Sequence, residues 1–553
     1  MKQGIIYIIA IVSLFLLRSI FFAANYGGIE HDSGWYLGVA RNLAQRGIYA
    51  SYTNTISHEE RGVQNSIHGR YSVQDENGFS YFPAGVTAGP GYIIPQALMM
   101  KIFGYDFWQF RLWPLLTYAG VLLIIFLIAH KLGGWFALLW LQLWFWFTPQ
   151  LFIQFSYESY GEHTALFYLL LSFYTYYLSA EIKKKQNIFM IFSGLFFSLA
   201  VLTKYLFLLS GTGFAIIAFW QLIRVPDKKK VIKLWGLWFL SLIIPLTSFE
   251  LYRYLFMLNK FDINSWRATT EDFLLHFRNN GGGLDISKID WGFVAKKGSF
   301  WNVVGVKAGF VWLIFLPLTY YYFKKIRSNT YLGILLFSAF VSTSLWFIFL
   351  SPFGWTRHVW HGLIIGMMLL IIVSVNSIKN YTAKILFILL FIAVILGRNI
   401  LNPSMFAGAF FLGQKNIDTW QMKRYEFGIQ GLPPNPMVSL QDQIGLRNFF
   451  AEHVRENDKV YYLGWLLVSE ASPIVDKVFY SLDRYLDTGQ LNPENGKQYL
   501  ILGPYQKGKL SIVGPEYNNL KVNILCNDIV YENPSYTLCI LRNNLIYENK
   551  AYE

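Results

Sequence analysis

The chain has 553 residues, of which 54% are hydrophobic, 19% aromatic and only 14% charged. A soluble protein carries roughly 25% charged residues, so this composition excludes an ordinary soluble enzyme and indicates a polytopic membrane protein. The net charge of +14 comes from cations in short loops between apolar segments. It therefore reflects membrane topology and does not predict nucleic-acid binding.

Apolar segments long enough to span a bilayer recur along the first 402 residues and predict about eleven transmembrane helices. The first segment, Ile5 to Ala24, is too long for a signal-peptide core and is expected to be a retained anchor. The predicted spans are 5–23, 112–129, 135–153, 163–180, 188–203, 205–223, 232–255, 303–323, 331–350, 359–375 and 384–401.

When these spans alternate, the basic loops all fall on one side, which the positive-inside bias identifies as the cytoplasm. The N-terminus lies on that side, and so do the clusters Lys183–Lys185, Lys228–Lys230 and Lys324–Lys325. We therefore predict a plasma-membrane protein whose long loop 25–110 and C-terminal part face the outside.

The stretch after the first span, Glu30-His31-Asp32-Ser33, carries acids at the membrane surface, where an ionisable group usually has a function. It opens a predicted amphipathic helix that Asp32 or Ser33 caps and that ends before Gly47. The apolar stripe of this helix consists of Tyr36, Val39, Ala40 and Leu43. Asp32 is a candidate general base.

Two further outer segments have a distinctive composition. The glycine- and proline-rich stretch Gly85–Tyr92 resists regular helix and leads into an amphipathic segment that ends at Phe103. The turn Ser156–His163 carries Glu158 and Glu162, which share a face if they lie in the first turn of the next helix. Helix capping alone is the simpler explanation for Glu162.

Three cationic or titratable residues lie at the outer ends of spans, against the usual charge bias. They are Lys204, Arg357 and His358. A lipid phosphate or pyrophosphate at the bilayer surface suits them, since arginine offers a bidentate fork and lysine a point charge. Snorkelling to ordinary headgroups is the simpler alternative for both cations. His358 and His361 are candidate ligands, but an interfacial polar residue is the simpler interpretation of each.

The acids also raise the question of a metal. Glu30-x-Asp32 has a spacing that grips hard divalent cations, but one such pair supplies too few ligands. Glu158 or Glu162 would have to converge on it, with help from His31, His163 or His358. No cofactor is required by the pattern, and a divalent metal stays an open alternative.

From about residue 403 the composition changes, and 440–553 is typical of a soluble α/β module. A helix is predicted at 441–456 and strands at 459–463, 498–502, 521–526 and 536–541. The two cysteines of the chain, Cys526 and Cys539, lie here, and both a disulfide and two free thiols remain possible. We predict a transmembrane domain over 1–402 and an extracytoplasmic α/β domain over 403–553.

Taken together, these segments resemble the GT-C superfamily of integral-membrane glycosyltransferases, near the protein O-mannosyltransferases and the bacterial aminoarabinose transferase. The resemblance rests on the first-loop acid, Tyr36-x-x-x-Ala40-Arg41-Asn42-Leu43, Thr87-x-Gly89-Pro90, Gly161-Glu162, Leu202-Thr203-Lys204 and Arg357-His358. No Walker loop, dinucleotide fingerprint, zincin motif or nucleophile elbow is present in a supporting context.

The resemblance implies outer juxtamembrane helices after the first span and a polyprenyl-phosphate-sugar donor. It implies that two carboxylates are catalytic: Asp32 as the general base that deprotonates the acceptor hydroxyl, and Glu162 as the residue that orients the acceptor or the sugar. It also implies that Lys204 and Arg357, with His358, face the donor phosphate. Glu30, Tyr36, Arg41 and Glu158 are supporting residues. Two departures leave the substrate class open: His31 replaces an acid beside Asp32, and His358 replaces the tyrosine that often follows the arginine.

The resemblance thus implies an inverting glycosyltransferase that moves a sugar, in the manner of a mannosyltransferase, to a glycan, lipid or protein hydroxyl on the outer face. The tail is not a β-trefoil, so it implies a different acceptor or a structural role. The alternatives are a metal-dependent oligosaccharide transferase that uses a lipid pyrophosphate and a flippase or transporter of a lipid-linked sugar. A non-catalytic scaffold or receptor is a further alternative.

Overall fold

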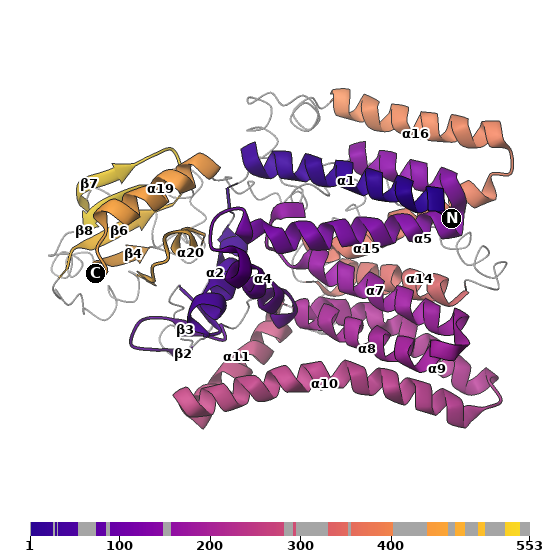
Figure 1. Ribbon diagram of the computed structural model, residues 1–553, viewed down its shortest axis with the longest axis horizontal. Helices are drawn as coiled ribbons and strands as arrows, with labels where there is room; N and C mark the ends of the chain where they lie inside the picture. The colour runs from indigo at the N-terminus through magenta and orange to yellow at the C-terminus, as the bar shows by residue number, and fades with distance from the viewer. Residues whose placement is uncertain are drawn as a thin grey trace.

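The chain forms a bundle of long helices with a small α/β domain at one end (Figure 1). The computed structural model describes residues 2–25, 28–29, 31–52, 73–83, 89–147, 156–280, 291–292, 294, 330–351, 356–401, 439–462, 470–481, 496–503 and 526–541. The N-terminus lies at the end of the bundle away from the α/β domain.

The helices of the bundle follow the apolar segments of the sequence. They are α1 (Lys2–Asn25), α5 (Gln109–Phe147), α7 (Glu162–Glu181), α8 (Gln186–Thr203), a 3₁₀ segment (Tyr205–Gly211) leading into α9 (Thr212–Arg224), α10 (Lys228–Lys260), α11 (Ile263–Asn280), α14 (Thr330–Leu345) with a π-helical turn (Trp346–Leu350), α15 (Trp360–Ser377) and α16 (Tyr381–Leu401). Within the described residues, 7 helical segments are long and apolar enough to cross a membrane.

Each predicted span except 303–323, which lies outside the described residues, coincides with part of one of these helices. The spans 112–129 and 135–153 are the two arms of α5, which changes direction at Gly134, where φ is 67°. The helix α7, which corresponds to 163–180, is not among the 7 apolar segments because its face toward the bundle carries polar residues.

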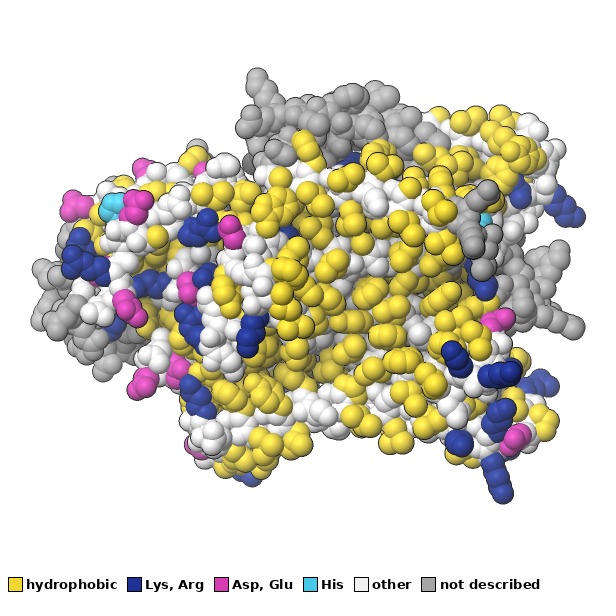
Figure 2. Space-filling view, viewed as in Figure 1, with side chains coloured by type: hydrophobic (Ala, Val, Ile, Leu, Met, Phe, Trp, Pro, Cys, Tyr) yellow, Lys and Arg dark blue, Asp and Glu magenta, His cyan; other side chains and the backbone are white. Residues whose placement is uncertain are grey.

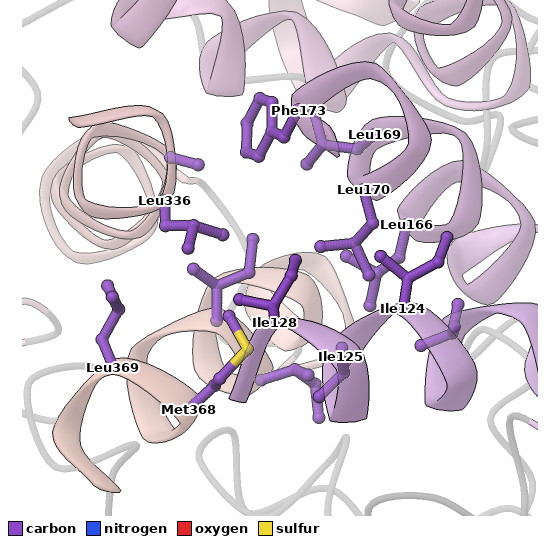
Figure 3. Packing of buried hydrophobic residues seen from close by; sticks show 14 of the residues in the cluster. Ile124, Ile125, Ile128, Leu166, Leu169, Leu170, Phe173, Leu336, Met368 and Leu369 are labelled. Carbon is purple, nitrogen blue, oxygen red and sulfur yellow. The ribbon is translucent and has the colours of Figure 1, made fainter. Parts of the chain in front are cut away.

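The centre of the bundle is packed by aliphatic side chains from four helices (Figure 3). Ile125 of α5, Leu170 of α7, Leu336 of α14 and Met368 of α15 are all fully buried there. Within a bilayer, such contacts hold the helices together by close van der Waals packing rather than by removal from water. The outer surface is a broad apolar belt, with lysines and arginines at the end where the N-terminus lies (Figure 2). This arrangement is that of a multi-pass membrane protein.

Two short helices, α2 (His31–Arg46) and α4 (Pro90–Phe103), run across the end of the bundle that faces the α/β domain (Figure 1). The predicted ends are confirmed: Gly47 and Gly104 follow them with φ of 71° and 106°. The predicted cap is wrong, because α2 already begins at His31, so Asp32 and Ser33 lie in its first turn. Next to α2, strands β1 (Ala50–Ser51), β2 (Val73–Gln74) and β3 (Ser80–Tyr81) form an antiparallel sheet in the order β1-β3-β2.

The C-terminal domain is a five-stranded sheet in the order β5-β4-β6-β8-β7. Its elements are α19 (Leu440–His453), β4 (Lys459–Tyr462), α20 (Ala471–Val475), β5 (Phe479–Ser481), β6 (Gln498–Leu502), β7 (Cys526–Glu532) and β8 (Thr537–Leu541). Strands β5, β4 and β6 are parallel, and β8 and β7 are antiparallel. The predicted helix and the strands at 459–463, 498–502 and 536–541 are present.

Of the fourth predicted strand, 521–526, only Cys526 lies within the described residues, and it is the first residue of β7. The continuation of β7 to Glu532, through the polar Asn527 and Asp528, was not predicted. Cys539 is disulfide-bonded, and Cys526 is the only other cysteine of the chain. The boundary between residues 402 and 403 lies outside the described residues.

Candidate functional site between the helical bundle and the C-terminal domain

The centre of the candidate site is an ion pair between two of the site residues that the sequence suggested, Glu162 and Lys204. The Lys204 ammonium donates to the Glu162 carboxylate, and both side chains are buried, at 7% and 1% exposed. Glu162 is the first residue of α7, and Lys204 follows the last residue of α8 in extended conformation. Helix capping alone does not account for Glu162, because α7 has no side-chain cap. The predicted acid and the predicted cation thus neutralise each other.

This pairing does not exclude a phosphate from Lys204. An ammonium carries three N–H donors, so one can bond a carboxylate while another bonds an anion. A buried ion pair costs desolvation energy, and removing one partner leaves a charge that is strongly destabilising. The ion pair therefore holds the Lys204 ammonium in one position, between the start of α7 and the end of α8.

The first turn of α2 meets the turn before α7 directly. The Ser159 N–H donates to Ser33 Oγ over 2.5 Å, and both serines are buried. Gly161, with φ of 79°, lets the chain turn from Ser159 into α7. The turn that contains Asp32 therefore abuts the turn that contains Glu162. The Asp32 side chain itself lies outside the described part of the chain, as does Glu30.

Glu158 does not share a helical face with Glu162, because it lies in the bend before α7 rather than in its first turn. It is buried, and its charge acts on two neighbouring groups, the Arg111 guanidinium and the Tyr92 phenol. Arg111 is itself buried and donates to the Ala23 carbonyl at the end of α1. The sequence reasoning missed Arg111, although a lone arginine at the start of an apolar helix is a visible signal.

The glycine-rich stretch lies against Lys204. The Gly89 N–H donates to the Thr203 carbonyl over 2.8 Å. A Cβ atom on Gly89 would lie 2.0 Å from the Leu202 carbonyl oxygen, and one on Gly91 would lie 2.4 Å from Thr203 Oγ1. Only glycine fits at either position, so the start of α4 fixes the backbone around Lys204. Residues 84–88, including Thr87, lie outside the described residues.

The start of α15 approaches the same place. The buried His361 ring stacks on Phe207 with 4.0 Å between centroids, and the charge of Lys204 acts on it. The Lys204 charge also acts on His163, which follows Glu162 and is fully buried. Arg357 and His358 lie in the 3₁₀ turn Thr356–Val359 that opens α15. The His358 ring is half-buried beside Trp346, and the Arg357 side chain is outside the described residues.

The two remaining supporting residues have structural contacts. Tyr36 is buried in the apolar cluster that joins α2 to α4. Arg41 forms an ion pair with Asp476 of the C-terminal domain at 3.2 Å and lies 5.6 Å from the Tyr105 ring centroid. Both residues hold α2 in place.

No group of three or more histidine, cysteine, aspartate or glutamate side chains that could bind a metal occurs among the described residues. The Glu30 and Asp32 side chains are not among the described residues, so a divalent metal bound there stays the open alternative that the sequence suggested.

The described architecture is a bundle of apolar helices with two short helices, α2 and α4, across the end that faces the α/β domain. Residues 88–249 match the sequence profile of the dolichyl-phosphate-mannose-protein mannosyltransferase family. Crystal structures of ArnT from Cupriavidus metallidurans, in the apo state and bound to undecaprenyl phosphate, match with TM-scores of 0.59 and 0.60. In both, sequence identity is 11% and 98% of each chain is covered.

The archaeal oligosaccharyltransferase AglB from Archaeoglobus fulgidus, in complex with an inhibitory peptide and a dolichol-phosphate, matches with a TM-score of 0.48 at 12% identity. The match covers 90% of this chain and 69% of AglB. No protein of curated function matches the sequence. The predicted resemblance to GT-C glycosyltransferases of the O-mannosyltransferase and ArnT branch is confirmed, over the fold by ArnT and over residues 88–249 by the family profile.

Proposed function

We propose that this protein is an inverting glycosyltransferase that moves a sugar from a polyprenyl-phosphate donor to an acceptor hydroxyl at the outer face of the membrane. The observation that carries the proposal is the hydrogen bond between Ser33 and Ser159. It joins the first turn of α2, which contains Asp32, to the segment just before Glu162, and Glu162 is paired with Lys204. It brings a candidate base, a second acid and a cation to one end of the bundle.

The proposed reaction is a single displacement at the anomeric carbon. The Asp32 carboxylate accepts the acceptor's hydroxyl proton while that oxygen forms the new glycosidic bond from the face opposite the phosphate. The bond from the anomeric carbon to the phosphate oxygen breaks, and its electron pair stays on the lipid phosphate. Lys204 and Arg357 stabilise that growing charge, with His358 beside them, and Glu162 orients the ammonium of Lys204.

An apolar cavity supports a lipid donor. It has a volume of about 810 Å³ and lies between α4, α8 and α10. Leu202 lines it, two residues before Lys204, and Lys101 at the last turn of α4 lies at its wall. A chain of isoprene units suits such walls, because it can exchange contacts with lipid tails for van der Waals contacts with apolar side chains at no cost in desolvated polar groups.

The relatives suggest the donor class. The family profile describes enzymes that use dolichyl-phosphate-mannose, and ArnT has been crystallised with undecaprenyl phosphate. Both compounds are polyprenyl phosphates or their sugar derivatives. A hexose or pentose on such a carrier is the substrate class that we propose, with a glycan, lipid or protein as acceptor.

The proposed orientation places the end with the basic loops, Lys183–Lys185 and Lys228–Lys230, in the cytoplasm. The N-terminus then lies inside the cell, and the site and the C-terminal domain lie outside the plasma membrane. A disulfide in the C-terminal domain supports this orientation, since disulfides persist in oxidising compartments.

The test is mass spectrometry of membrane lipids and glycans from cells in which the gene is replaced by the Asp32→Asn variant. We expect one polyprenyl-phosphate-sugar to accumulate and one glycan to disappear. The matched control is Asp227→Asn, which alters a helix cap at the basic end of α10 and should leave both pools unchanged.

Normal transfer by the Asp32→Asn variant would remove Asp32 from the mechanism. Movement of the lipid-linked sugar across proteoliposomes without bond cleavage would indicate a flippase instead. Loss of transfer on chelation of divalent cations, restored by adding them back, would favour the lipid-pyrophosphate alternative.

A further inference from the structure

One face of α2 is covered by the short helix α20 of the C-terminal domain. Gly34, Gly38 and Arg41 are spaced by four and three residues, so they lie on the same face of α2. They contact α20 and its two flanking residues, in the same chain direction, at Glu470, Pro473 and Asp476.

The two glycines let the backbones approach closely. A Cβ atom at Gly34 would lie 2.1 Å from the Cα atom of Glu470, a contact with backbone that cannot move aside. A Cβ atom at Gly38 would lie 3.6 Å from the Pro473 Cβ and 3.1 Å from the Tyr52 ring. Gly34 therefore accepts no side chain while α20 is docked, whereas Gly38 accepts a small one after a slight shift.

The far end of the contact is held by charge. Asp476, with φ of 55°, closes α20 and accepts from the Tyr52 hydroxyl over 2.5 Å. It also pairs with Arg46 at 3.0 Å and Arg41 at 3.2 Å. Arg41 in addition donates to the Pro473 carbonyl. Several of these groups are partly buried, which limits screening by salt.

The near end is held by an amide. The Gln443 side chain accepts from the Ile29 N–H and donates to the Ile29 carbonyl, each over 2.7 Å. Gln443 is fully buried. The C-terminal domain thus binds the chain just before α2, at Ile29, and again along α2 as far as Arg46. These contacts lie on both sides of the turn that contains Asp32.

Glu470 lies at the centre of this contact. One of its oxygens accepts from the Tyr536 hydroxyl over 3.1 Å, and the other has no hydrogen-bond partner among the described residues. Its side chain is buried, and burial raises the pKa of the carboxyl to about 8. Among the described side chains, the titratable groups around it are Tyr536 and Asp442 on α19, which bonds Ser535.

We propose that Glu470 and α20 form a positioning element, supplied by the C-terminal domain, that fixes the first turn of α2 and with it Asp32. The C-terminal domain is then part of the site rather than a separate binding module. A neutral Glu470 packs against the Gly34 backbone, whereas an ionised one introduces a buried charge that no cationic side chain among the described residues pairs with, and this charge loosens the contact. The proposal rests on the proposed role of Asp32.

The first experiment measures docking without any substrate. A Gly38→Cys, Pro473→Cys pair should form a disulfide on oxidation, since the expected Cβ separation of 3.6 Å suits one. The linked peptides are identified by mass spectrometry of the full-length protein in detergent. Adding Gly34→Ala should lower the cross-linked fraction at least about tenfold. Adding Gly236→Ala, whose new Cβ meets nothing within 4 Å, should not. Equal cross-linking in the presence of Gly34→Ala would overturn the docking.

The second experiment measures positioning. With the donor found by the lipid analysis above, Gly34→Ala should lose about a hundredfold in transfer rate while it still binds undecaprenyl phosphate. Transfer by the wild type should fall about tenfold between pH 7 and pH 9, as Glu470 ionises, and transfer by Glu470→Gln should not. If Gly34→Ala fails to bind the lipid, its transfer rate no longer tests positioning, and the comparison of the pH profiles of the wild type and Glu470→Gln tests it instead.

The outcomes separate the two proposals. Identical pH profiles for the wild type and Glu470→Gln, or full transfer by a Gly34→Ala protein that no longer cross-links, would overturn the positioning role. Full transfer by Asp32→Asn would instead overturn the proposed function and leave the docking result intact.

Discussion

The buried pair of Glu162 and Lys204 allows a structural role to be separated from a catalytic one. Both side chains are almost inaccessible, so Glu162→Gln leaves a buried ammonium and Lys204→Met leaves a buried carboxylate. Breaking a buried pair typically costs about 3–5 kcal/mol, whereas replacing both partners with neutral groups is often close to neutral. The double variant should therefore regain most of the stability that each single variant loses.

The assay is a double-mutant cycle on the free energy of unfolding in detergent, with transfer rate measured on the same samples. We expect each single variant to lose about 3–5 kcal/mol and the double variant to lie within about 1 kcal/mol of the wild type. Transfer should stay at least about a hundredfold below wild type in Lys204→Met and in the double variant, because the cation for the phosphate is gone.

Two results would refute this reasoning. Single variants as stable as the wild type would show that the pair is not buried together. A double variant with restored transfer would show that Lys204 serves only to neutralise Glu162, and would remove Lys204 from the stabilisation of the leaving phosphate.

Two further predictions concern the surroundings of the site. Gly89→Ala should destabilise the protein and abolish transfer, since its Cβ would lie 2.0 Å from the Leu202 carbonyl; Gly236→Ala, in open space, should gain up to about 1 kcal/mol of helix stability. Glu470→Gln should stabilise the protein increasingly from about pH 5 to pH 8, by at most about 5 kcal/mol, in pH-dependent unfolding experiments. The reason is that burial raises the pKa of this acid from 4.5 to about 8, so the folded wild type loses stability through that range. A difference that does not change with pH would contradict the second prediction.

Much of the architecture depends on local patterns and was predicted from the sequence. The membrane helices follow from runs of apolar residues, because a span must satisfy its backbone internally and bury its side chains in hydrocarbon. The ends of α2 and α4 follow from Gly47 and Gly104, since glycine adopts positive φ at little cost. The strands β4 and β6 follow from short β-branched and aromatic segments.

The partners of the polar residues were decided only by the tertiary structure. The pairing of Glu162 with Lys204 joins residues 42 apart through the packing of α7 on α8. Arg41, which the motif suggested as a supporting site residue, binds Asp476, more than four hundred residues away. The short helix α20 was missed, and β7 was predicted only at its first residue, because neither carries a periodic apolar pattern. Burial makes each such polar contact specific, and burial depends on which segments meet. The sequence therefore proposed candidate site residues, but only the folded chain showed which of them contact one another.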